Sequence, residues 1–269
     1  MSRLSSVFSD LRKQNQKGLI PYVVAGDPSP EGTVALLHSL VEAGADVLEV
    51  GVPFSDPMSE GPVIQQGHER ALANGMSLQR VLEMVTAFRR DNGSTPIVMM
   101  GYANPIERFG YDAFAKACAE AGVDGLITVD LPPEEVDAID GALQSVGLDN
   151  IFLISPTTPE ARIQTIVERA RGFIYYVAVK GVTGSGQLDT DEVARSVSLI
   201  REKTALPIAV GFGIKDAASA SAVAASADAV VVGSALINKM ENAMDTPSRI
   251  PEEVAALVAS MRAAMDARS

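Results

Sequence analysis

Glu49 is a carboxylic acid in the middle of an apolar run formed by Val47, Leu48 and Val50. An ionised carboxylate inside such a run is costly to bury unless it is paired, and no Lys or Arg closes a neighbouring apolar run. Burial raises the pKa of a carboxyl group, which suits a residue that gives and takes protons near neutral pH. We therefore predict that Glu49 is an acid–base catalyst. The alternative is a structural Glu that forms a salt bridge inside the fold.

The segment that follows Glu49, residues 51–62, contains two acidic residues among several prolines and glycines. This composition predicts a long, shaped loop, and long loops at strand ends commonly carry function. Glu60 is the second candidate catalytic carboxylate. Its alternative is an acid in the first turn of a following helix, where it would interact with the helix dipole and Pro62 would lie near position N1. The residues by themselves leave both interpretations open.

Three glycine-containing segments, residues 181–186, 211–213 and 233–234, follow apolar runs near the end of the chain. Glycines let backbone N–H groups approach an anion closely, and a helix that starts at Ser234 would direct its positive end to the same place. We therefore predict a phosphate site formed by these segments. Residues 181–186 could also act as a lid.

The elements that must position these residues are short apolar runs that alternate with segments of helical length. Strands are expected at residues 20–24, 47–50, 97–100, 125–129, 151–154, 173–177, 208–210 and 229–232. Helices are expected at residues 30–43, 77–90, 111–121, 134–146, 159–171, 191–203, 216–226 and 251–268. The strands lack apolar–polar alternation, so both of their faces should be buried. Eight strands in strict β–α alternation predict an α/β fold, a (β/α)8 TIM barrel, with its active site at the carboxyl ends of the strands. The strand-end candidates include Asp27, Asn104, Asp130 and Tyr175.

Residues 1–17 place Leu4, Phe8 and Leu11 at helical spacing, with charged residues between them. This pattern predicts an extra N-terminal amphipathic helix and differs from the continuous apolar run of a signal peptide. No linker or low-complexity segment interrupts the chain, so residues 1–269 are expected to form a single barrel domain.

Residues 43–46, 121–124 and 225–228 repeat a pattern of three small residues followed by Asp, just before an expected strand. Small residues permit a tight turn from helix to strand, so we interpret this repeat as structural.

Composition excludes several classes of function. The formal net charge of −12 argues against nucleic-acid binding, which needs clustered Lys and Arg. Cys118 is the only cysteine, so an internal disulfide is impossible, and two histidines cannot build a His-rich metal site. His38 and His68 are expected to be solvated or packed helix side chains. No apolar window reaches the ~20 residues needed to span a bilayer, so we expect a cytoplasmic protein with no membrane contact.

Together these motifs resemble the α subunit of tryptophan synthase over nearly the whole chain. Residues 51–57, Gly-Val-Pro-Phe-Ser-Asp-Pro, are especially specific to that family. The other matching segments are residues 25–28, 49–61, 100–105, 130–135, 181–184, 210–214 and 232–234.

The resemblance implies a cofactor-free retro-aldol cleavage of indole-3-glycerol phosphate into indole and glyceraldehyde 3-phosphate, in tryptophan biosynthesis. Glu49 matches the acid–base glutamate of the family. Glu60 replaces the usual loop aspartate, which stabilises the positive indole nitrogen. Its carboxylate lies one methylene further out, about 1.5 Å of extra reach, so either the loop backbone has adjusted or the chain turns over more slowly.

The same resemblance assigns the residues that would contact the substrate. Tyr175 matches the tyrosine beside the reacting glycerol chain, and Thr183 matches the lid threonine that closes over the loop carboxylate. The residues that would enclose the indole ring are Tyr22, Ile64, Met100 and Phe212. The residues whose backbone groups would hold the phosphate are Gly184, Gly213, Gly233 and Ser234.

Members of the family pair with a β subunit that carries pyridoxal phosphate, in an α2β2 assembly. Pro53 and Asp56 match the loop that touches this partner, although they could equally serve only to shape the loop. Two other functions stay open: a catalytically weak α-type chain that mainly activates a β partner, and another phosphate-binding barrel of the same pathway.

Overall fold

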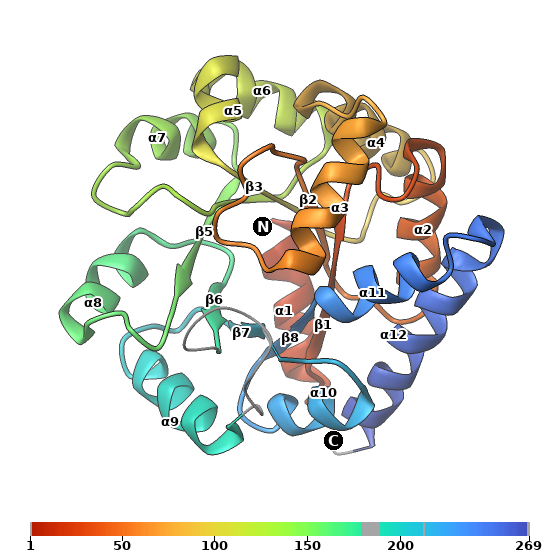
Figure 1. Ribbon diagram of the computed structural model, residues 1–269. Helices are drawn as coiled ribbons and strands as arrows, with labels where there is room; N and C mark the ends of the chain where they lie inside the picture. Colours follow the sequence, from red (N-terminus) through yellow and green to blue (C-terminus); the bar gives the residue numbers. More distant parts are fainter. Residues whose placement is uncertain (1, 179–188, 212, 268–269) are drawn as a thin grey trace.

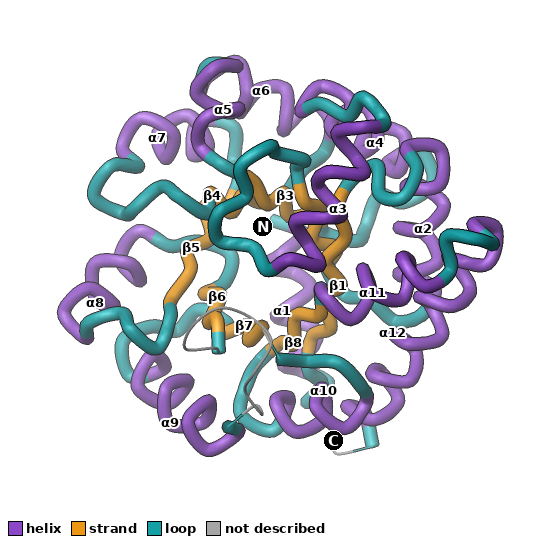
Figure 2. The backbone as a smooth tube through the Cα atoms, in the orientation of Figure 1, coloured by secondary structure: helices purple, strands orange, loops and turns teal. Residues whose placement is uncertain are grey.

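The computed structural model describes residues 2–178, 189–211 and 213–267. Within these ranges eight parallel strands pair in sequence order and close into a barrel through the pairing of β8 with β1. The strands are β1 (Gly18–Val24), β2 (Leu48–Gly51), β3 (Ile97–Gly101), β4 (Gly125–Thr128), β5 (Asp149–Ile154), β6 (Ile174–Val177), β7 (Ile208–Gly211) and β8 (Ala229–Val232). Figure 2 shows them as an inner ring enclosed by helices. The predicted barrel is therefore confirmed.

The helices follow the strands in the expected alternation. They are α1 (Arg3–Lys13), α2 (Pro30–Glu42), α3 (Pro62–Ala73), α4 (Leu78–Arg89), α5 (Ala103–Phe109), α6 (Tyr111–Ala121), α7 (Asp137–Ser145), α8 (Glu160–Arg169), α9 (Thr190–Arg201), α10 (Ala217–Ala224), α11 (Ser234–Asn242) and α12 (Ile250–Asp266), with a 3₁₀ turn, η1 (Pro247–Arg249). Across the described part of the chain, none of these helices is long and apolar enough to cross a membrane.

Two helices differ from the sequence prediction. The helix expected from residue 134 begins at Asp137, because residues 132–135 form a turn in which Glu135 N–H donates to the Pro132 carbonyl. The short helix α5 was not expected. Its first N–H, that of Ala103, donates to Asp130 Oδ1 over 2.7 Å, so a residue far along the chain helps to start it.

The N-terminal helix closes one end of the barrel. Leu4, Phe8 and Leu11 are buried and belong to one cluster with the inward-pointing side chains of the strands, among them Ile20 and Val98. Figure 1 shows α1 within the ring of strands when the barrel is viewed along its axis. The predicted extra helix is thus part of the barrel core.

The repeated turn before β2, β4 and β8 has an electrostatic role as well as a steric one. In each copy the Asp accepts the N–H of a residue near the start of the preceding strand and forms an ion pair with an arginine of a surrounding helix. The three sets are Asp46 with Leu19 and Arg262, Asp124 with Ile97 and Arg89, and Asp228 with Ile208 and Arg201. These contacts join the helical layer to the end of the barrel opposite the expected active site.

Candidate active site

Glu49 lies in β2 at the register position of Tyr22 in β1 and Val98 in β3. It shares the inward face of Val47, because alternate residues of a strand point to the same side. The residue is 1% exposed, and neither carboxyl oxygen has a hydrogen-bond partner among the described residues. Burial, reinforced by the charge of Glu60, raises the pKa of Glu49 to about 8. Among the described residues, the carboxyl group of Glu49 is thus unpaired, as predicted, and none of the ion pairs there involves it, as the salt-bridge alternative would require.

Glu60 lies at the end of the loop between β2 and α3 and is 8% exposed. Gly61 is the N-cap of α3, and the first turn of that helix contains no acidic residue, so the alternative of a first-turn acid is wrong. Burial raises the pKa of Glu60 to about 7. Its carboxylate is close enough to Glu49 for its charge to raise the pKa of that residue.

The backbone around Glu60 is held by two neighbouring elements. Gln65 Nε2, in the first turns of α3, donates to the Glu60 carbonyl over 2.9 Å. Ser59 N–H donates to Tyr102 Oη over 3.3 Å, and the Tyr102 ring stacks on Phe54 with a centroid distance of 5.1 Å. The loop therefore presents Glu60 from a defined backbone position.

The two carboxyl groups titrate as a coupled pair. Glu60, with a pKa raised to about 7, loses its proton first, and its charge then opposes the ionisation of Glu49, whose pKa is raised to about 8. Between these values Glu49 is a proton donor and Glu60 is an anion. The site can thus protonate one atom of a ligand and stabilise positive charge on another.

Two buried tyrosines, Tyr22 and Tyr175, lie close enough to Glu49 and Glu60 to feel the charge of both carboxylates. A Cβ atom at Gly51 would lie 2.4 Å from Tyr22 Oη, and one at Gly211 would lie 2.3 Å from Tyr175 Oη, so each ring lies over a glycine of the next strand. Burial, with smaller effects from the two carboxylates, raises the pKa of both tyrosines. Both hydroxyl groups therefore stay protonated near neutral pH and are available as hydrogen-bond donors.

Of the remaining side chains predicted to contact the ligand, only those of Ile64 and Met100 lie in the described part of the chain. Ile64, on α3, is 7% exposed, and Met100, in β3, is half-buried beside the interior cluster. Phe212, Thr183 and Gly184 lie outside the described residues.

Three of the residues predicted to hold a phosphate, Gly213, Gly233 and Ser234, follow the ends of β7 and β8, which pair in the barrel. Gly213 has a φ of 76°, a backbone conformation that favours glycine. Gly233 is the N-cap of α11, Ser234 is its first residue, and no described side chain caps this N-terminus. The first N–H groups of α11 are thus available to an anion.

Three other strand-end candidates, Asp27, Asp130 and Asn104, are not part of this site. Asp27 is buried and receives two hydrogen bonds from the Arg70 guanidinium, at 2.7 and 3.0 Å. Asp130 caps the first N–H of α5, and Asn104 is exposed on that helix.

His68 is a residue of the site that the sequence did not reveal as such. It is 2% exposed on α3, it accepts the Phe54 N–H, and it is hydrogen-bonded to Tyr22. Burial lowers the pKa of His68 to about 4, so the ring is neutral near pH 7. The sequence did contain an indication that His68 belongs to the site, because His68 lies one helical turn after Ile64 and therefore on the same face of α3. The expectation of a packed helix side chain is confirmed, but it omitted these contacts.

The two residues expected to touch a partner differ in accessibility. Pro53 is buried within the chain, whereas Asp56 is exposed. Met58, two residues further on, is 75% exposed, which makes it the most exposed large hydrophobic residue in the described part of the chain.

The fold and this site define a class of protein: an α/β-barrel enzyme of acid–base chemistry, with a buried carboxyl pair and an uncapped helix N-terminus at the same end of the barrel. Comparison with known proteins then gives the family. The sequence profile of the family described as "Tryptophan synthase alpha chain" matches residues 8–266, and the chain belongs to this family.

Individual relatives support the assignment over the full length. The tryptophan synthase alpha chain of Nitrosococcus oceani is 54% identical over 99% of this chain and 98% of its own, and that of Thioalkalivibrio sulfidiphilus is 55% identical over 99% and 100%. The crystal structure of tryptophan synthase subunit alpha from Legionella pneumophila superposes with a TM-score of 0.93 at 46% identity, covering 99% of both chains. A chain of tryptophan synthase from M. tuberculosis, in the aminoacrylate-bound form, gives a TM-score of 0.88 at 35% identity, over 98% of this chain and 100% of that one. The alternative of a different phosphate-binding barrel is thereby set aside.

Proposed function

We propose that Glu49 is the general acid–base with which this tryptophan synthase alpha chain cleaves indole-3-glycerol phosphate into indole and glyceraldehyde 3-phosphate. The observation that carries the proposal is the buried carboxyl group of Glu49, which has no hydrogen-bond partner in the part of the chain that the structure describes. A structural carboxylate would have a cation or a set of donors around it, whereas a catalytic one must stay free to exchange protons with a ligand.

The reaction moves one proton from the side-chain hydroxyl of the substrate to the indole ring carbon that carries the side chain. Glu49 in its acid form protonates that carbon, and the ring nitrogen becomes positive. The Glu49 carboxylate then removes the hydroxyl proton, the hydroxyl-bearing carbon becomes the aldehyde carbon, and the carbon–carbon bond breaks. Its electron pair returns to the ring and neutralises the nitrogen. Glu49 ends the cycle protonated, as it began.

Glu60 supplies the negative charge that this sequence requires. Its carboxylate stabilises the positive ring nitrogen, which matches the role of the loop carboxylate in the family. The coupled pKa values support this division, because ionisation of Glu60 keeps Glu49 protonated at the start of the reaction. The anchored backbone of Glu60 supports the idea that the loop has adjusted to the longer side chain.

The remaining site residues bind the substrate in this proposal. Tyr22, Ile64, Met100 and Phe212 enclose the indole ring. Tyr175 contacts the glycerol chain, and Thr183 is the lid residue that closes over the loop carboxylate. The groups that hold the phosphate are those of Gly184, Gly213, Gly233 and Ser234. Support comes from the burial of Tyr22, Ile64 and Tyr175 and from the uncapped start of α11.

The test is indole formation by the Glu49→Gln variant. Loss of the proton donor should reduce kcat by at least about 10²- to 10⁴-fold while KM changes little. Glu42→Gln, at an exposed position of α2, is the matched control and should keep wild-type turnover. Near-normal cleavage by Glu49→Gln would show that another group transfers the proton.

We also propose that residues 1–269 form one domain that pairs with a pyridoxal-phosphate β subunit in an α2β2 assembly, through the loop that carries Pro53 and Asp56. The exposed side chains of Asp56 and Met58 would meet the partner, and buried Pro53 would shape the loop from within. Asp56→Ala should weaken the association of the two purified chains in sedimentation velocity and leave indole formation by the isolated chain unchanged. Unaltered association would remove Asp56 from the interface.

A further inference from the structure

Both ring nitrogens of His68 are engaged, and their partners determine which nitrogen carries the proton. Phe54 N–H donates to Nδ1 over 3.1 Å, so Nδ1 must be unprotonated. The proton of the neutral ring is therefore on Nε2, which donates to Tyr22 Oη over 3.3 Å. His68 thus joins a residue of β1 to a backbone group of the loop after β2.

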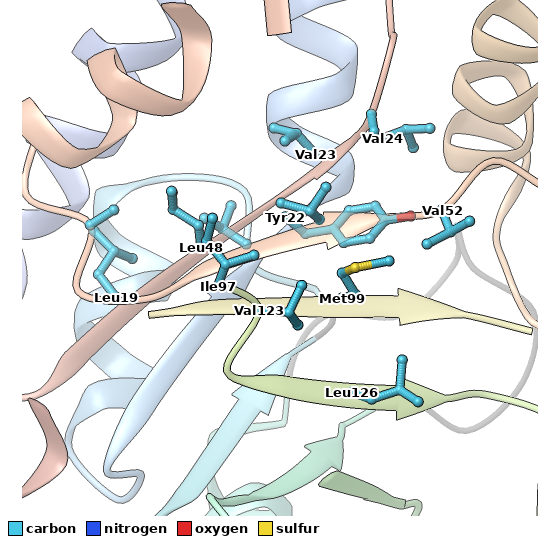
Figure 3. Close-up of a cluster of buried hydrophobic side chains, with 14 of the residues drawn as sticks. Leu19, Tyr22, Val23, Val24, Leu48, Val52, Ile97, Met99, Val123 and Leu126 are labelled. Atoms are coloured by element: carbon cyan, nitrogen blue, oxygen red, sulfur yellow. The ribbon is translucent and has the colours of Figure 1, made fainter. Parts of the chain in front are cut away.

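The Tyr22 side chain has little freedom to move away from this contact. Its hydroxyl group lies over Gly51, and a Cβ atom at Gly233 would lie 3.2 Å from Tyr22 Cδ1 on the other side. In Figure 3 the ring lies across the strands with its oxygen directed toward Val52. Because Oη accepts the His68 proton, the hydroxyl proton of Tyr22 is free to point into the pocket.

The loop that carries Glu60 is consequently held at both of its ends. His68 holds it near the start, at Phe54, while Tyr102 and Gln65 hold it near the end. The same Phe54 ring stacks on Tyr102, so the two anchors are in contact. Loss of the first anchor would let the loop shift relative to Glu49.

We infer that His68 is a positioning residue for the cleavage reaction: it fixes the loop so that Glu60 faces Glu49, and it orients the Tyr22 hydroxyl in the pocket. This inference rests on the proposed function, in which Glu49 and Glu60 act on one substrate. His68 itself need not touch the substrate. Its effect is on geometry, and an active-site displacement of about 1 Å can reduce the rate on the order of 10²-fold.

Two conservative variants separate the two contacts. In His68→Asn the side-chain oxygen replaces Nδ1 and keeps an acceptor for Phe54, but the side chain is too short to reach Tyr22. In His68→Gln the amide nitrogen replaces Nε2 and keeps the donor to Tyr22, but the acceptor for Phe54 is lost. His68→Leu removes both contacts, and Tyr22→Phe removes only the hydroxyl group.

We expect His68→Leu to reduce kcat for indole formation about 10- to 100-fold, with KM within about threefold of wild type. Tyr22→Phe and His68→Asn should each reduce kcat about three- to tenfold, the value of one oriented hydrogen bond. Because both changes break the same bond, the double variant should be no slower than either single variant. The kcat of His68→Gln should lie between that of His68→Leu and that of the wild type. Urea unfolding midpoints, measured on every variant, separate these effects from a general loss of stability.

Either of two results would overturn the inference. One is that the losses in kcat multiply in the Tyr22→Phe/His68→Asn double variant. The other is that His68→Leu keeps a kcat within about twofold of wild type. Glu49→Gln, assayed in parallel, distinguishes this failure from failure of the proposed function. If Glu49→Gln is inactive while the His68 variants are normal, only the role of His68 is wrong. If Glu49→Gln remains active, the proposed chemistry is wrong as well.

Discussion

Replacing Glu49 by Gln should stabilise the folded protein at neutral and alkaline pH while it abolishes cleavage. Gln has nearly the shape of a protonated Glu, so the variant mimics the acid form at every pH. In the wild type, ionisation of Glu49 places a charge in a pocket where neither carboxyl oxygen has a described hydrogen-bond partner. Stability lost in this way is recovered when the group can no longer ionise.

The magnitude follows from the pKa of Glu49, which burial and the charge of Glu60 raise from 4.5 to about 8. The contribution of Glu49 to the free energy of unfolding is therefore fully present below pH 4.5, where the group is protonated in both states. It is lost as pH rises toward and through 8. The loss is roughly 3 kcal/mol at pH 7 and roughly 5 kcal/mol above pH 9, at about 1.4 kcal/mol per pKa unit. Wild type and variant should therefore be almost equally stable near pH 4 and diverge as pH increases.

The assay is urea unfolding followed by circular dichroism at several pH values, since the chain contains no Trp for fluorescence. Glu42→Gln, at an exposed position, is the matched control and should follow the wild type at every pH. A constant difference in the free energy of unfolding between Glu49→Gln and wild type from pH 5 to pH 9 would refute the argument. It would mean that Glu49 finds a partner on ionisation or is not desolvated in solution.

Three further predictions concern the site. The kcat for cleavage should rise with pH as Glu60 ionises, because its pKa is raised to about 7, and should fall as Glu49 loses its proton, because its pKa is raised to about 8. A pH–rate profile checks this, and the Glu60→Gln variant should lack the rising limb. Glu60→Asp should reduce indole formation about tenfold or more in a steady-state assay, because the anchored loop is set for the longer side chain; a gain would show that the length is a handicap. Gly211→Ala should lower the free energy of unfolding by about 1–3 kcal/mol in urea, because the new Cβ would lie 2.3 Å from Tyr175 Oη; an unchanged midpoint would show that the ring moves away freely.

The sequence by itself determined the barrel and the central catalytic candidate. Eight apolar runs without alternation can be satisfied only by strands buried on both faces, and the helical segments between them leave few other topologies. Glu49 was recognisable for a local reason, since a carboxylate within an apolar run has no inexpensive structural explanation. The glycines at the ends of β7 and β8 were recognisable in the same way, from residue type and position alone.

Tertiary structure decided what depends on neighbours that are distant in the chain. Whether Glu60 belongs to the first turn of α3 or to the pocket depends on where that helix begins and on the contacts of its backbone with Gln65 and Tyr102. The link from Tyr22 through His68 to Phe54 exists only because α3 packs beside β1, and no local pattern specifies that packing. The pKa of Glu49 itself is a tertiary property, since its desolvation and the charge of Glu60 both arise from the closed barrel. The carboxyl group was evident from the sequence, but its proton affinity was not.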